Sequence, residues 1–134
     1  MKILYNDERC LRQEVDWLLC SGGIISVDIL EDLAKFQGYQ GNDENLSEFT
    51  YNEEDILEIE QDGISFPKSE GKVCLIYWKD YYFDEIITVV LYDADVFYQY
   101  LKQESLRAAL IHPFQSKRII TSLAKIKHDL KLDH

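Results

Sequence analysis

Residues whose side chains could support chemistry are few in this chain of 134 residues, and they stand far apart. They are His112, His128, His134, Cys10, Cys20 and Cys74. None of them has the spacing of a metal-binding or catalytic motif such as CxxC, HExxH or GxSxG, and there is no glycine-rich phosphate loop. We therefore expect no catalytic residue, no metal and no cofactor, and we predict that the chain is not an enzyme. The odd number of cysteines indicates reduced, mostly buried thiols.

One acidic stretch partly matches a calcium-binding loop. The template's ligand positions fall on Asp43, Asn45, Ser47, Phe49, Tyr51 and Glu54. The middle of that loop requires glycine because the backbone turns sharply there, and this sequence has Glu48 instead. We attribute the match to the acidity of the stretch and do not expect bound calcium.

The acidic residues are distributed unevenly. Residues 1–70 contain 17 acidic and 5 basic side chains, net −12, whereas residues 71–134 contain 8 acidic and 9 basic ones, net +1. Within Asp43–Asp62 there are nine carboxylates and no lysine or arginine. Like charges gathered in this way either form a solvated face that keeps the protein soluble or form a docking surface that pairs with cations on another molecule.

We favour a docking surface for a basic protein partner. Its acidic residues are predicted to be Glu53, Glu54, Asp55, Glu58, Glu60 and Asp62. Its aromatic anchors are predicted to be Trp78, Tyr81 and Tyr82, which lie at or beside a strand connection where burial of all of them is difficult. The net charge of −11 argues against nucleic acid and anionic membranes as partners.

The length predicts one domain spanning residues 1–134. The chain begins without the pattern of a signal peptide and contains no apolar run of membrane-spanning length, so we expect it to be cytoplasmic.

The centre of the fold is predicted from two apolar runs, Val73–Trp78 and Ile86–Tyr92. Their length and β-branched composition are typical of neighbouring antiparallel strands. The residues that would point to either face of these strands are apolar. We therefore expect protein on both faces, or protein on one face and an interface on the other. Met1–Tyr5 fits an edge strand.

Two further strands are predicted upstream. Apolar and acidic residues alternate from Leu57 to Glu60, which indicates a strand with one wet face. Asp62-Gly63 is a strong signal for a two-residue hairpin turn, and the return strand would end near Pro67. Short connections then make a four-stranded antiparallel meander the simplest topology. Residues 38–55 are expected to form a surface loop, with a short helical turn as the alternative.

Helices are predicted at both ends of the chain. Asn6 or Asp7 would cap a first helix running to about Cys20, with Glu14 on its solvent side, and Ser26 would cap a second, Val27–Gln37, with Phe36 on its core side. Ser21-Gly22-Gly23 between them predicts a helical hairpin. The C-terminal helices are expected at about 94–111 and 116–130, separated by His112-Pro113. The predicted fold is therefore α+β: an N-terminal helical hairpin, a four-stranded antiparallel meander and two C-terminal helices.

In size, acidity, order of elements and the passage Thr88–Leu101 (TVVLYDADVFYQYL), the chain resembles bacterial immunity proteins of polymorphic-toxin and contact-dependent growth inhibition systems. The acidity and the aromatic residues predict an inhibitor that binds a basic enzyme, with a nuclease as the expected target, and occludes its active site. The resemblance implies that this target is a cognate toxin domain, neutralised in the cytoplasm, and that the chain itself performs no catalysis. No family motif is matched residue by residue, so no site residue follows from it. The alternatives are a DNA-mimic inhibitor of a nucleic-acid-binding enzyme, a small ligand-binding or enzymatic domain without a recognisable motif, and an adaptor whose acidity serves solubility.

Overall fold

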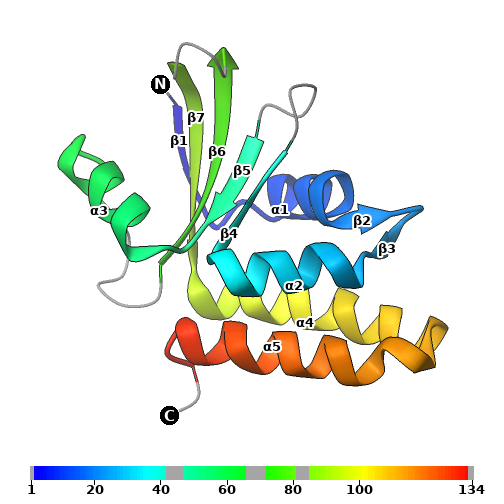
Figure 1. Ribbon diagram of the computed structural model, residues 1–134. Coiled ribbons are helices and arrows are strands. Elements are labelled where there is room, and N and C mark those ends of the chain that lie inside the picture. The colour runs from blue at the N-terminus through cyan, green and yellow to red at the C-terminus, as the bar shows by residue number, and fades with distance from the viewer. Residues whose placement is uncertain (1, 42–46, 66–71, 81–84, 133–134) are drawn as a thin grey trace.

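A computed structural model describes residues 2–41, 47–65, 72–80 and 85–132. The α-helices are α1 (Glu8–Glu14), α2 (Val27–Phe36), α3 (Glu53–Gln61), α4 (Ala94–Ile111) and α5 (Ser116–Asp129). The strands are β1 (Lys2–Tyr5), β2 (Cys20–Ser21), β3 (Ile24–Ile25), β4 (Gly38–Gln40), β5 (Ser47–Thr50), β6 (Lys72–Asp80) and β7 (Glu85–Asp93). Figure 1 shows the main sheet standing between α3 on one side and α1 and α2 on the other, with α4 and α5 below.

The predicted central pair of strands is confirmed. β6 and β7 run antiparallel, with Leu75 opposite Val90. Alternate residues of both strands enter two separate apolar cores: Val73 and Val90 belong to the large core beneath the helices, whereas Cys74 and Leu91 belong to a smaller one on the other face. Protein therefore covers both faces of this pair, as the unbroken apolar runs indicate.

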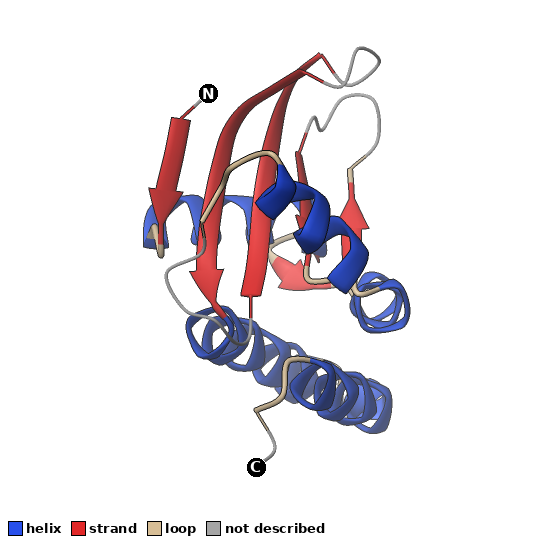
Figure 2. Ribbon diagram, turned by 90° about the vertical axis from the view of Figure 1, so that its left-hand side faces the viewer, coloured by secondary structure: helices blue, strands red, loops and turns tan. Residues whose placement is uncertain are grey.

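The antiparallel meander is wrong. The main sheet has five strands in the order β1-β7-β6-β5-β4, and β1 at one edge runs parallel to β7. Asn6 ties this edge in place, because it adopts a left-handed conformation (φ 48°), donates its backbone N–H to Leu91 O and accepts the N–H of Asp93 on its side-chain oxygen. Figure 2 shows the mixed sheet with β1 at its edge.

The predicted hairpin around Asp62-Gly63 is also wrong, because the residues expected to form its first strand belong to helix α3. The apolar residues Ile56 and Ile59 lie three apart and face the sheet, while Leu57 is 56% exposed. Asp62 at the end of the helix has a negative φ (−77°), and of the two residues only Gly63 has a positive φ (89°). The Gly63 N–H donates to Glu60 O and the Ile64 N–H to Ile59 O, which is the helix-ending Schellman pattern.

Residues 38–55, expected to be a loop, contain β4, β5 and the start of α3. Phe49 on β5 is fully buried and its ring lies 5.4 Å from that of Phe97 on α4. β4 approaches so closely that a Cβ on Gly38 would meet Phe49 O at 2.8 Å. Strands β4 and β5 are short, and only alternate residues in them face the core. Their sequence is therefore mostly polar, which is why it predicts a loop.

The N-terminal helical hairpin is likewise corrected. Asp7 caps α1 as expected, accepting the N–H of Cys10 at 2.8 Å, but the helix continues as a π-helix over Val15–Leu19 and is followed by the small hairpin β2–β3. Gly22 and Gly23 supply its two positive φ values. Glu14 is buried, not solvent-facing, and its carboxylate accepts the Ser47 hydroxyl at 2.9 Å.

The C-terminal helices are confirmed near their expected bounds, and Ser26 caps α2 as expected. Together with α2 they cover one face of the sheet, contributing Leu30, Leu101 and Ile126 to the large core. Phe36, expected to face the core, is 61% exposed at the end of α2. No helix within the described ranges is long and apolar enough to cross a membrane.

The end of α3 offers a direct test of this fold. We expect Gly63→Ala to lower the free energy of unfolding by about 1 kcal/mol, because an alanine at φ 89° is strained although its methyl group meets no atom within 4 Å. Gly63→Asn should lose less, since asparagine tolerates the left-handed region better. Urea denaturation of both variants measures the difference, and an alanine variant as stable as wild type would contradict the helix-ending role of Gly63.

Candidate docking surface

Six of the predicted site residues come together on α3 or at its end. Glu54, Glu58 and Asp62 follow one another at intervals of one helical turn and are exposed, with Leu57 exposed beside them. We call these four residues the acidic ridge. Ile56 and Ile59 hold the opposite side of the helix against the sheet, so the ridge projects away from the domain. The ridge is thus a row of three carboxylates with one apolar side chain, Leu57, beside it.

The first turn of α3 explains part of the acidity structurally. Glu53, Glu54 and Asp55 lie at the positive end of the helix dipole, where carboxylates are stabilising. The Asn52 side chain caps the helix by accepting the N–H of Glu54 at 3.0 Å, and Asp55 accepts the Thr50 hydroxyl at 2.8 Å. These acids assist helix formation whether or not a partner exists.

The last turn of α3 has no such explanation. Glu58, Glu60 and Asp62 lie near the negative end of the dipole, and the turn contains no basic residue. Glu60 is nearer the sheet and pairs with Lys72 of β6. In the described part of the chain no ion pair within 4 Å involves Glu54, Glu58 or Asp62, and Glu53 has only a fully solvated contact with Lys131 at 4.0 Å.

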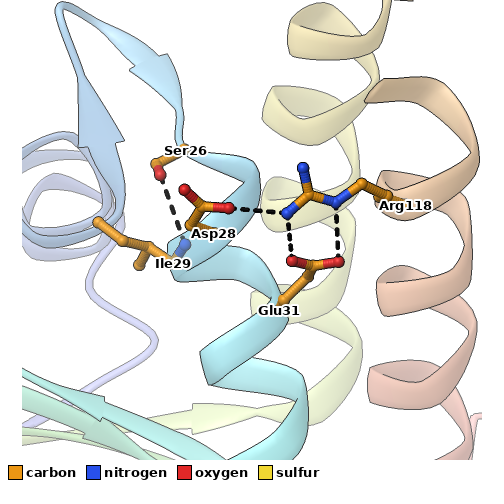
Figure 3. A network of polar contacts seen from close by, with 5 residues as sticks. All are labelled: Ser26, Asp28, Ile29, Glu31 and Arg118. Atoms are coloured by element: carbon orange, nitrogen blue, oxygen red, sulfur yellow. Dashed lines mark hydrogen bonds and ion pairs between the residues drawn. The ribbon is translucent and has the colours of Figure 1, made fainter. Parts of the chain in front are cut away.

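Other acids of the first half do find cations within the protein. Arg118 of α5 binds two carboxylates of α2, as Figure 3 shows. Its Nε donates to Glu31 Oε2 and one terminal nitrogen donates to Glu31 Oε1. The same terminal nitrogen also donates to Asp28 Oδ1 at 2.7 Å. The guanidinium lowers the pKa of Glu31, and the two carboxylates raise that of Arg118. The final helix thus supplies a cation to Asp28 and Glu31 of α2 but not to the ridge.

The predicted aromatic anchors remain untested. Trp78 has its backbone in β6, opposite Ile86, but its side chain lies outside the described part, as do Tyr81 and Tyr82 entirely.

The structure adds a hollow that sequence reasoning missed. It lies where α2 and β4 meet β5 and the start of α3, with a volume of about 360 Å³. Its lining includes the aromatic residues Phe36 and Tyr39 and the acidic residues Asp32, Glu48 and Asp55. It opens to solvent, and its mixture of aromatic and acidic residues suits a lysine or arginine side chain. All of these residues fall between positions 32 and 55, but the sequence pattern does not indicate that they meet, because it predicts a loop over residues 38–55.

The cysteine and histidine side chains, which could support chemistry, are not assembled into a reactive centre in the described structure. Cys10 and Cys20 are half-buried, Cys74 is buried, and no disulfide joins any two of them. Burial, with Asp16 and Glu104 nearby, raises the pKa of Cys20 to about 11, and burial also raises that of Cys74, so both stay protonated near neutral pH. Among the described residues no cluster of His, Cys, Asp and Glu could hold a metal. Ser47 and Phe49, placed in the calcium-loop match, lie in β5 with their side chains buried.

Comparisons with protein-family models, with curated proteins and with solved structures gave no match.

The Arg118 cluster predicts a pH-dependent contribution to stability. Because the folded-state pKa of Glu31 lies below its ordinary value of 4.5, the pair stabilises the fold above that pH and loses this effect as the pH falls through the lowered pKa. We expect Arg118→Gln to be less stable than wild type at pH 7, with the difference shrinking at pH 3, in urea denaturation.

Lys117→Gln is the matched control, because Lys117 is adjacent, exposed and in no ion pair among the described residues. An equal loss in both variants, or a loss that persists unchanged in acid, would contradict a specific link between α2 and α5.

Proposed function

We propose that this chain is an acidic inhibitor that binds a basic protein through α3, as an immunity protein binds its cognate toxin, with a nuclease as the expected target. The observation that carries the proposal is the outward-facing acidic ridge, for which the described part of the chain supplies no cation, whereas Asp28 and Glu31 of α2 receive Arg118. An enzyme that binds nucleic acid needs a cationic surface for phosphates. A protein that covers this surface would block its substrate.

The composition of the ridge suits such an interface. Leu57 provides an apolar centre, and Glu54, Glu58 and Asp62 form a charged rim. Opposite charges steer two proteins together and reject partners of the same sign more than they add affinity. Specificity and fast association are what an inhibitor of a toxic enzyme requires.

The attachment of α3 to the sheet supports the same reading. Ile56, Ile59 and Ile64 pack with residues of β6 and β7, and the Schellman turn fixes the end of the helix. The carboxylates are therefore presented on a preformed surface, so binding orders little backbone. The hollow beside β4 adjoins α3 through Asp55 and can receive a further basic side chain.

Mimicry of duplex DNA fits this surface less well. The ridge runs from Glu54 to Asp62, a rise of roughly 12 Å over eight steps of 1.5 Å. A B-DNA duplex carries about seven charges over that length, whereas the ridge carries three. We therefore favour recognition of a basic protein surface over imitation of nucleic acid.

The test uses the protein encoded immediately upstream of this chain's gene, the position of a toxin gene in such systems. We expect co-expression to give a stoichiometric complex whose association slows as salt rises. The triple variant Glu54→Gln, Glu58→Gln, Asp62→Asn should weaken binding by about 2 kcal/mol, roughly thirtyfold in Kd, because each exposed pair contributes below about 1 kcal/mol.

A matched triple variant, Glu8→Gln, Asp16→Asn, Asp95→Asn, removes the same charge from exposed positions elsewhere. It should bind nearly as wild type does in isothermal titration calorimetry. Equal weakening by the two variants would show that net charge, and not the ridge, governs binding.

A further inference from the structure

The turn between α4 and α5 carries a group of exposed apolar side chains. Leu106 and Leu110 lie one turn apart on α4, Ile111 ends that helix, and Phe114 is fully exposed in the following 3-10 turn. We call these four residues the helical tip. Single exposed apolar residues are ordinary, but consecutive turns of them at one end of a domain indicate a contact surface.

The charge around the tip is opposite to that of the protein as a whole. Between residues 102 and 118 there are four lysines and arginines and one acid, Glu104. Arg118 is paired with Asp28 and Glu31 of α2. Glu104 pairs with Arg107, which also donates to Gly23 O. Lys102, one turn before Leu106, and Lys117, just after Phe114, are exposed and form no ion pair among the described residues.

We propose that the helical tip docks on the acidic ridge of a second copy of this chain. The tip presents apolar side chains between lysines, and the ridge presents Leu57 among carboxylates, so the two surfaces match in polarity and sign. Contact between two tips would bring lysines together, and contact between two ridges would bring carboxylates together. The charges therefore select a head-to-tail contact over a symmetric one.

The placement of the two surfaces allows this contact. Figure 1 shows α3 and the α4–α5 turn on opposite sides of the molecule, and in Figure 2 α3 lies toward the viewer while α4 and α5 recede. A copy can therefore receive a tip on its ridge and offer its own tip to the next copy. The net charge of −11 on each copy repels its neighbours and keeps the association weak. The inference does not depend on the proposed function, although a basic partner on the ridge would compete with the tip.

Sedimentation velocity of the protein alone tests the proposal. We expect the weight-average mass of the wild type to rise above the monomer mass between about 0.1 and 1 mM, the range of a weak contact. The tip variant Leu110→Gln, Phe114→Gln and the ridge variant Leu57→Gln, Glu58→Gln should each remain monomeric. Trp17→Gln, which removes an exposed apolar side chain outside both surfaces, should associate as wild type does.

Mixing the two double variants decides between contact geometries. The tip variant keeps an intact ridge and the ridge variant keeps an intact tip, so the mixture should form dimers and no larger species. A wild type that stays monomeric up to 1 mM, a tip variant that still associates, or a ridge variant that associates alone through its tip would each overturn the proposal.

Discussion

Strands β6 and β7 are apolar on both faces, and the rest of the domain is arranged to cover them. One face packs on the large core built by α1, α2, α4 and α5, and the other receives α3 through Ile56 and Ile59. Burial of apolar area is the main favourable term in folding, so neither cover is dispensable. Because the inner side of α3 is committed to the sheet, its acidic side must face outward. The position of the ridge thus follows from the core.

Electrostatics then divides the carboxylates into two groups. Asp28 and Glu31 of α2 serve the fold, because Arg118 joins them to α5. Glu58 and Asp62 at the end of α3 lie against the helix dipole and form no ion pair in the described structure. A cost of this kind, small for each residue, is the usual mark of a surface shaped by something other than stability. It also makes the domain bipolar, with an acidic ridge and a basic helical tip.

Much of this architecture could be anticipated from local patterns. The β6–β7 pair followed from its apolar runs, the caps at Asp7 and Ser26 from residue type, and the C-terminal helices from their spacing and His112-Pro113. The errors have physical reasons. Leu57 and Ile59 alternate with acids, which imitates a strand, but Ile56 completes a helical stripe. Asp62-Gly63 serves equally as a hairpin turn or a helix end. The parallel pairing of β1 and the burial of Glu14 depend on contacts distant in sequence, and the hollow depends on strands β4 and β5, whose polar composition predicts a loop.

The central claim is that α3 covers the sheet with one side and docks a basic partner with the other. Amide hydrogen exchange of the protein, free and in complex with its basic partner, tests this most directly. The account expects the largest gain in protection at Glu53–Gly63, with the β6–β7 core equally protected in both states. A complex in which these amides exchange as fast as in the free protein, while protection rises elsewhere on the surface, would contradict it.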